Sequence, residues 1–235
     1  MKFPTSELNT FLRTAGGTIE GIISIYGDFG VGKTTYALQT AINAAKEEKN
    51  IVYIYSKPNF PMEKVGNILN EMTPERQSDI LDKIIFIQTT DFNDLNTIVF
   101  NLEFLVLSNL KDKDKMLNLI VIDSITDLYR IELDREKKSK NVELNLKLSQ
   151  IMANLFYINE TYSIEALIIN ESSRKTIDDI TTEIQAGGKV MDYWIRYEIK
   201  ISRTETVNQR KFEIMKHPEE INLEFLSNLT NQGFK

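Results

Sequence analysis

The sequence has no cysteine and a single histidine, and both features exclude classes of site. Without cysteine, neither a disulfide framework nor a thiolate metal site can form. One histidine, His217, does not make a metal site by itself, and a structural or surface role is the ordinary one for such a residue. The absence of cysteine is compatible with a reducing compartment, and we expect a cytoplasmic protein.

Long apolar runs and an excess of positive charge are also lacking. The longest apolar stretches have the length of β-strands, which excludes a helix that spans a bilayer, and residues 1–7 lack the apolar centre of a secretory signal. We therefore expect no membrane partner. The net charge of −6 argues against a protein that coats nucleic acid with its whole surface, although it leaves local basic loops open. With 42% hydrophobic residues, the 235-residue chain can bury the core of one domain.

The most informative stretch runs from Gly27 to Thr35 and reads Gly-Asp-Phe-Gly-Val-Gly-Lys-Thr-Thr. An apolar run precedes it and a segment of helical periodicity follows it, which is the strand, loop and helix order of a phosphate-binding loop. Its glycines allow a tight turn whose N–H groups point at an anion. Lys33 can reach the β- and γ-phosphates of ATP, and the Thr34 hydroxyl can ligate Mg²⁺. The predicted nucleotide-binding residues here are Gly27, Asp28, Phe29, Gly30, Val31, Gly32, Lys33, Thr34 and Thr35.

A second apolar strand, residues 117–122, ends in Asp123. A carboxylate at the carboxyl end of a buried parallel strand faces the crevice in which ligands of open α/β sheets bind. Aspartate also commonly caps strands, so the metal interpretation depends on the phosphate-binding loop upstream. Together the two motifs predict that Thr34 and Asp123 hold Mg²⁺.

Hydrophobic periodicity predicts an α/β fold with a mostly parallel sheet and helices on both of its faces. After residue 195 the apolar residues recur with period two in three successive runs, which predicts an antiparallel extension of the sheet over residues 195–226. The polar segment 227–235 is expected to fray. The expected strands are residues 21–26, 51–55, 84–87 and 117–122, and the expected helices include residues 5–12, 91–110 and 141–158.

Two strings, residues 26–35 and residues 123–133, resemble the ATPase core of the RecA/RadA recombinase superfamily. The second, Asp-Ser-Ile-Thr-Asp-Leu-Tyr-Arg-Ile-Glu-Leu, is the more specific one. Within the superfamily the chain is similar to the archaeal RadB-type paralogues of RadA, and the similarity extends from about residue 16 to residue 217. The resemblance implies one RecA-like phosphate-loop NTPase domain over residues 1–235, with residues 1–17 forming an N-terminal helix and loop. It also implies ATP and Mg²⁺ as cofactors and a role in homologous recombination and DNA repair.

The same resemblance implies two DNA-facing loops, residues 130–140 and residues 172–186, the second ending at Gly187-Gly188. Without the resemblance, the mixed charges of residues 134–140 would be read as a solvated face. The segment 215–218 is similar to the part that caps the nucleotide of a neighbouring subunit in family filaments. The basic residues expected to contact DNA are Arg130, Arg135, Lys137, Lys138, Lys140, Arg174 and Lys175.

Two further positions are implied nucleotide contacts. Asn170 and Glu171 stand where the family has an Asn-Gln pair that senses the γ-phosphate. Lys64 stands where the family has an arginine that stacks on adenine, and an ordinary helix-surface lysine is an equally good interpretation of it.

Three departures from the family pattern bear on activity. Lys57 stands where the family has the glutamate that orients the attacking water, which predicts slow DNA-dependent ATP hydrolysis or none. Glu171 replaces the sensing glutamine, and its carboxylate either repels a γ-phosphate or substitutes for the missing glutamate. The candidate catalytic residues are therefore Lys33, Asp123 and Glu171. The segment 3–6 only loosely resembles the Phe-x-x-Ala tether of family filaments, so a dimer or a hetero-partner is expected rather than a RadA-like filament.

Three functions remain open at this point. The first is an ATP-binding recombination accessory that binds single-stranded DNA, a RadA-type recombinase or another paralogue. The others are a non-hydrolysing nucleotide-binding scaffold and a KaiC-like signalling ATPase that does not bind DNA. The string from Asp123 to Arg130 favours the recombinase branch, whereas the missing glutamate favours the scaffold.

Overall fold

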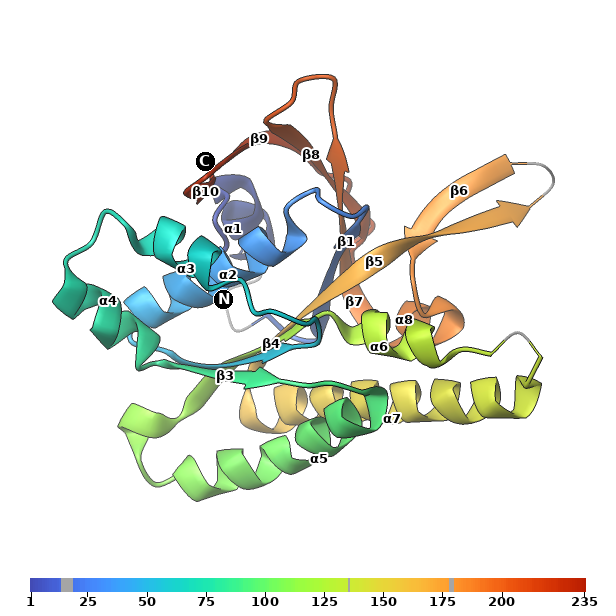
Figure 1. Cartoon of the computed structure of the whole chain (residues 1–235), viewed down its shortest axis with the longest axis horizontal. Helices are drawn as coiled ribbons and strands as arrows, with labels where there is room; N and C mark the ends of the chain where they lie inside the picture. Colours follow the sequence, from blue (N-terminus) through green and yellow to red (C-terminus); the bar gives the residue numbers. More distant parts are fainter. Residues whose placement is uncertain (14–18, 135, 178–179) are drawn as a thin grey trace.

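The computed structural model describes residues 1–13, 19–134, 136–177 and 180–235. They form an α/β domain around one ten-stranded sheet of order β10-β9-β8-β7-β1-β5-β4-β2-β3, with β6 paired to β5 (Figure 1). The predicted fold class, a RecA-like mostly parallel sheet with an antiparallel C-terminal extension, is confirmed.

The central strands pair in parallel. In β1, β2 and β4 the apolar runs are nearly continuous, as expected for strands with both faces covered. The parallel strands are β1 (Ile22–Gly27), β2 (Asn50–Tyr55), β3 (Ile84–Gln88), β4 (Leu117–Asp123), β5 (Glu165–Ile177) and β7 (Ile195–Arg203). The antiparallel strands are β6 (Ile180–Gln185), β8 (Gln209–Lys216), β9 (Glu224–Thr230) and β10 (Gly233–Phe234).

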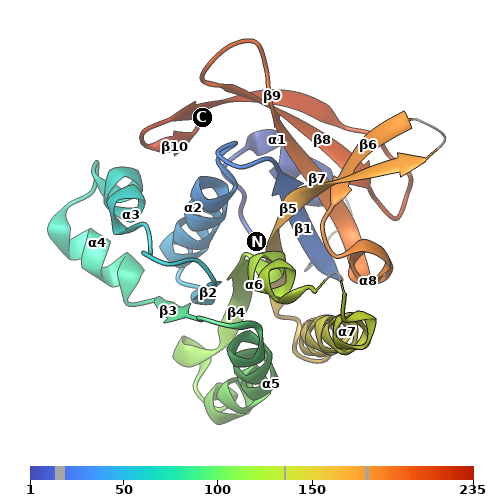
Figure 2. The same ribbon diagram turned by 45° about the vertical axis from the view of Figure 1, so that its right-hand side comes forward.

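Alternate residues of the central strands β1, β2, β4 and β5 enter two separate cores, one on each face of the sheet. In β2, Tyr53 packs into the core that contains α2, whereas Val52 and Ile54 pack into the core that contains α5 and α7. Figure 2 shows α2, α3 and α4 on one side of the sheet and α5 and α7 on the other. The helices are α1 (Ser6–Arg13), α2 (Lys33–Lys46), α3 (Met62–Leu69), α4 (Pro74–Leu81), α5 (Phe92–Asn109), α6 (Ile125–Glu132), α7 (Lys138–Tyr162) and α8 (Gly188–Trp194), with a 3₁₀ turn at Lys113–Lys115.

The expectation that residues 227–235 fray is wrong. Strand β9 continues to Thr230, β10 follows it, and Phe234 is only 3% exposed. Its ring packs against Tyr36 and Phe212 at centroid distances of 5.2 and 5.4 Å. One buried aromatic side chain therefore orders a segment whose composition is polar. The antiparallel extension was predicted for residues 195–226, but β7 pairs in parallel with β1, and the added antiparallel strands β8, β9 and β10 lie within residues 209–234.

The start of the chain belongs to the same core. Phe3 is 2% exposed and stacks on Tyr36, and the Thr5 hydroxyl lies 2.7 Å from the Tyr36 hydroxyl. The phenylalanine of the loosely tether-like segment thus packs within its own subunit. Among the residues described, no helix combines the length and apolar character needed to cross a bilayer.

Candidate nucleotide-binding site

The loop between β1 and α2 lies at the carboxyl edge of the parallel strands, in the middle of the sheet. Two of its glycines are required by the backbone. A Cβ on Gly27 would lie 2.1 Å from the Ile201 carbonyl oxygen of β7, and Gly32, at φ 105°, has a left-handed conformation that favours glycine. A Cβ on Gly32 would also lie 2.9 Å from Leu229 and Phe234. The loop is therefore held by the C-terminal strands as well as by its own sequence.

Lys33, the first residue of α2, extends its side chain back into this loop. Its Nζ donates to the carbonyl oxygens of Gly27 at 2.7 Å and Asp28 at 2.8 Å, and to Glu171 Oε2 at 2.8 Å. The side chain is 5% exposed. The ammonium thus lies where a loop of this kind binds an anion, and the anion next to it is the chain's own Glu171 carboxylate.

Asp123 ends β4 and is fully buried. Its Oδ2 accepts a hydrogen bond of 2.9 Å from the Tyr53 hydroxyl, while its Oδ1 has no partner in the described part of the chain. Burial raises the pKa of Asp123, and the Lys57 ammonium and the hydroxyls of Thr34 and Tyr53 act in the opposite direction. A buried carboxylate oxygen without a donor, close to a threonine hydroxyl, is the ligand chemistry that Mg²⁺ prefers. Thr34 and Asp123 therefore fit a divalent cation.

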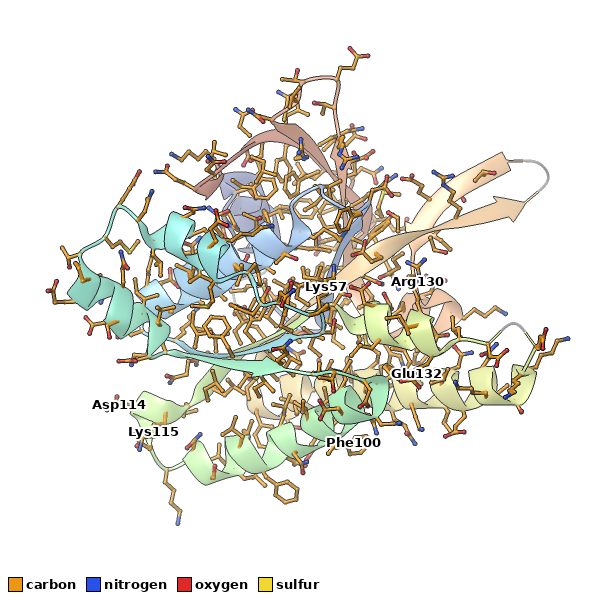
Figure 3. The ribbon with its side chains drawn as sticks, in the orientation of Figure 1. Lys57, Phe100, Asp114, Lys115, Arg130 and Glu132 are labelled. Carbon is orange, nitrogen blue, oxygen red and sulfur yellow. The ribbon has the colours of Figure 1, made fainter. Side chains whose placement is uncertain are left out.

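A chain of alternating charges continues from Lys33 across the edge of the sheet. Glu171 Oε1 lies 3.1 Å from Lys57 Nζ, and that ammonium lies 3.1 Å from Asp127 Oδ2. Burial lowers the pKa of Lys57, but the carboxylates of Asp127, Asp123 and Glu171 outweigh it and raise the pKa overall. Figure 3 shows Lys57 near the middle of the molecule. The two charged departures from the family pattern, Lys57 and Glu171, are thus partners.

The residue before Glu171 anchors a buried polar network. Asn170 Oδ1 accepts from the Thr126 hydroxyl and from the Glu171 amide at 2.8 Å. Its Nδ2 donates to the Ala186 carbonyl at 2.8 Å and to Gln185 Oε1 at 3.3 Å. Asn170 is fully buried, and all of these contacts are with protein groups. The structure therefore joins it to α6 and to the end of β6 rather than to the surface of the phosphate-binding loop.

Lys64 lies on the exposed side of α3, and its Nζ contacts Thr35 Oγ1 at 3.4 Å. It is thus adjacent to the start of α2. A contact with adenine remains a prediction.

The segments implied to face DNA contain more regular structure than loops. Arg130 lies in α6, Lys138 and Lys140 lie in the first turn of α7, and only residues 133–137 connect the two helices. Residues 172–177 of β5 and residues 180–185 of β6 form two antiparallel strands, which pair from Ser172–Gln185 to Ile177–Ile180. The basic side chains that the structure describes here, Arg130, Lys137, Lys138, Lys140 and Arg174, are all exposed. Arg135 and the side chain of Lys175 lie outside the described residues.

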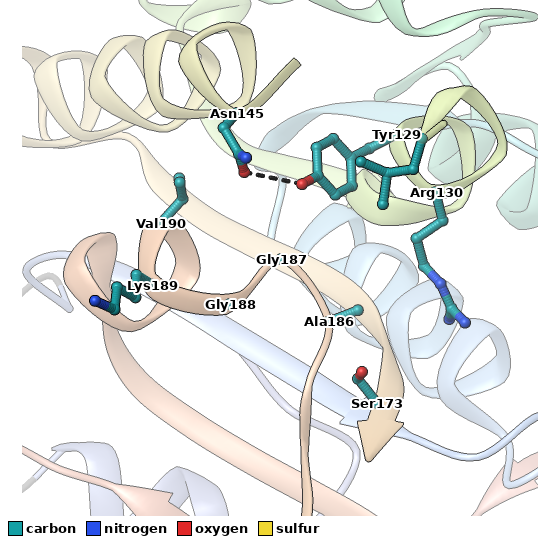
Figure 4. Close-up of a pocket in the computed structure, with 10 residues that line it drawn as sticks. Tyr129, Arg130, Asn145, Ser173, Ala186, Gly187, Gly188, Lys189 and Val190 are labelled. Carbon is teal, nitrogen blue, oxygen red and sulfur yellow. Dashed lines mark hydrogen bonds between the residues drawn. The ribbon is translucent and has the colours of Figure 1, made fainter. Parts of the chain in front are cut away.

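A pocket of about 420 Å³ separates the two segments (Figure 4). The Tyr129 hydroxyl donates to Asn145 Oδ1 at 2.9 Å on one side, and Gly187 and Gly188 line the other. Arg130 also lines it. The structure therefore places an arginine of the first segment and the glycine pair that ends the second around one pocket, an arrangement that spacing in the sequence did not reveal.

Comparison with known proteins agrees with this geometry. The chain is 29% identical over 199 residues to the DNA repair and recombination protein RadB of Methanococcus maripaludis, an alignment that covers 85% of this chain and 84% of that protein. It is 28% identical over 204 residues to the RadB of Methanobrevibacter smithii, covering 86% and 82% of the two chains. For the RadB of Methanocaldococcus jannaschii the identity is 29% over 189 residues, covering 80% and 81%. The Rad51 family model matches residues 3–235. The chain therefore belongs to the Rad51 family, and the predicted resemblance to RadB-type members of the RecA/RadA superfamily is confirmed.

Proposed function

We propose that the protein binds ATP and Mg²⁺ and acts as an accessory in homologous recombination and DNA repair, where it binds single-stranded DNA, a RadA-type recombinase or both. The observation that carries the nucleotide site is the arrangement of Lys33 within its glycine loop beside Asp123, whose buried Oδ1 lacks a donor. The names of the relatives, each a DNA repair and recombination protein, support the biological role.

Each residue of the site has a distinct part in this proposal. The loop amides and the Lys33 ammonium bind the phosphates. Thr34 and Asp123 hold Mg²⁺, which when bound neutralises phosphate charge. Tyr53 fixes the Asp123 carboxylate through the hydrogen bond to Oδ2, leaving Oδ1 for the cation.

Hydrolysis is expected to be weak or absent. Two residues after the end of β2 stands Lys57, an ammonium that cannot accept a proton from water while it is charged. Without nucleotide, both Glu171 oxygens are engaged by lysines, so Glu171 can act as a base only after a ligand displaces it from them. The loss of a water-orienting base costs about 10²–10⁴ in rate. The presence of Lys57 in place of a water-orienting glutamate also favours the second candidate function, a nucleotide-binding scaffold that does not use DNA.

The nucleotide proposal is tested by the ATP-induced shift in melting temperature with Mg²⁺ present. A ligand that binds only the folded state raises stability by about 2.7 kcal/mol at a hundredfold excess over its Kd. We expect Lys33→Ala to abolish the shift. An equal shift in the variant would refute the site. The steady-state rate of phosphate release, with Lys33→Ala as the blank, then separates a slow ATPase from a scaffold.

The DNA proposal is tested by the salt dependence of binding to a fluorescent single strand. Lys137→Ala should weaken binding and reduce the slope of log affinity against log salt by about one unit, as expected when one phosphate contact is lost. Lys115→Ala is the control. Lys115 is also a surface residue, but it precedes β4 and therefore lies at the amino ends of the parallel strands, away from the segments implied to face DNA. Binding that depends on neither salt nor Lys137 would favour the scaffold.

A further inference from the structure

Two lysines share one carboxylate at the phosphate-binding loop. Each oxygen of Glu171 has its own ammonium, Oε2 with Lys33 at 2.8 Å and Oε1 with Lys57 at 3.1 Å. The Glu171 side chain is 12% exposed, so water screens these contacts less than it would at the surface. The carboxylate is thus bracketed by two cations.

A phosphate can equally bind between two ammonium groups. Phosphate oxygens, like carboxylate oxygens, accept charge-assisted hydrogen bonds from separate donors, and a terminal phosphate carries more negative charge than a carboxylate. A phosphate and the Glu171 carboxylate cannot both lie against Lys33 without strong repulsion. Whatever phosphate approaches Lys33 must therefore compete with Glu171 for it.

We propose that Lys57 is a second phosphate-binding cation of this site, and that the terminal phosphate of a nucleoside triphosphate replaces Glu171 between Lys33 and Lys57. The proposal rests on the proposed ATP site and deepens it, since it assigns a residue that selects triphosphate over diphosphate. Glu171 is then an internal substitute for the terminal phosphate when none is bound. Lys57 acquires a role that does not depend on hydrolysis.

The structure keeps Lys57 in place independently of Glu171. Its Nζ is also paired with Asp127 Oδ2 at 3.1 Å, from α6. The preceding residue, Ser56, is buried and fastened to the end of β4: its hydroxyl donates to the Ser124 carbonyl at 2.7 Å and accepts from the Ser124 amide at 2.8 Å. Displacement of Glu171 therefore leaves the Lys57 ammonium anchored beside Asp123 and available to a new anion.

The test is isothermal titration of the full chain with Mg²⁺ and either ADP or a non-hydrolysable ATP analogue. Glu171→Gln removes the competing charge and should tighten analogue binding at least fivefold. In that background, Lys57→Met should weaken analogue binding about tenfold, which corresponds to about 1.4 kcal/mol, while ADP binding changes less than twofold. Lys57→Gln gives the same comparison if the methionine variant does not fold, and Lys57→Arg should retain most of the affinity.

Lys83→Met is the matched control. The Lys83 side chain is 27% exposed, against 26% for Lys57, and it is also ion-paired, with Glu48 at 3.7 Å. Lys83 precedes β3 and therefore lies at the amino ends of the parallel strands, away from the phosphate-binding loop. It should leave both affinities within twofold.

If Lys57 serves only to hold Glu171, the expected changes in affinity for the ATP analogue are different. Lys57→Met alone would then release Glu171 and tighten analogue binding, and in the Glu171→Gln background it would have no effect. Either result overturns the inference, while loss of binding in Lys33→Ala would still uphold the ATP site. Failure of the unmodified chain to bind either nucleotide would overturn the proposed function and this inference together.

Discussion

Replacing Phe234 by alanine tests whether the C-terminal strand is an integral part of the domain. Phe234 is almost completely buried and makes edge-to-face contacts with Tyr36 and Phe212. Removal of a buried phenylalanine side chain costs about 3–5 kcal/mol, and the lower figure applies here because a two-residue strand can partly collapse into the space. We therefore expect Phe234→Ala to lower the free energy of unfolding by about 3 kcal/mol.

Urea unfolding followed by tryptophan fluorescence measures this change. The single tryptophan, Trp194, packs against the other core of the sheet, so its signal reports unfolding beyond the C-terminal strands. With a slope of about 3 kcal/mol per molar urea, the midpoint should fall by about 1 M. Phe234→Leu, which keeps most of the apolar volume, should lose less than half as much. A loss under 0.5 kcal/mol, on the order of an ordinary surface substitution, would mean that residues 227–235 fray and that the packing argument is wrong.

Two further predictions concern buried polar groups. Tyr53→Phe removes the hydrogen-bond donor to the buried Asp123 Oδ2, so the free energy of unfolding measured in urea should fall by about 2 kcal/mol. Tyr55→Phe is the control. A loss under about 0.5 kcal/mol in Tyr53→Phe would contradict a stabilising role of this hydrogen bond. Burial and the nearby Asp192 raise the pKa of Glu198 in the folded protein above its ordinary 4.5. The fold therefore favours the protonated side chain, and stability decreases as pH rises through the folded-state pKa and Glu198 becomes ionised. Glu198→Gln should therefore raise the melting temperature at pH 8 and give little gain at pH 4, and a gain that does not depend on pH would refute this assignment.

The strands and the helix that frame the candidate site were predicted from local sequence, whereas the binding roles of its residues remain predictions. Glycine spacing between an apolar strand and a helix located the loop, and an apolar strand ending in Asp123 located the carboxylate at the same edge of the sheet. These signals lie within short segments, because a strand end and a helix start are encoded by neighbouring residues.

The partnership of Lys57 and Glu171 was not predicted, because the two residues are 114 positions apart and meet only through the strand order β1-β5-β4-β2. A signal did exist: two departures from one family pattern have opposite charge, which is what a compensating pair would show. The ordered C-terminus was missed for a related reason, since Phe234 finds its partners on α2 and β8 rather than along the chain.

The β5–β6 hairpin extends away from the candidate nucleotide site, so a change in the angle of its base would displace its far end. Glu171 lies at its base, and the paired residues from Ser172 to Ile177 extend about 20 Å at about 3.3 Å per residue. If exchange of Glu171 for a phosphate tilts that base by about 10°, the far end of the paired ladder moves by about 3.5 Å, roughly one residue of extended chain. The hairpin would then act as a lever, turning the release of Glu171 from Lys33 into a displacement that a bound strand or partner can sense.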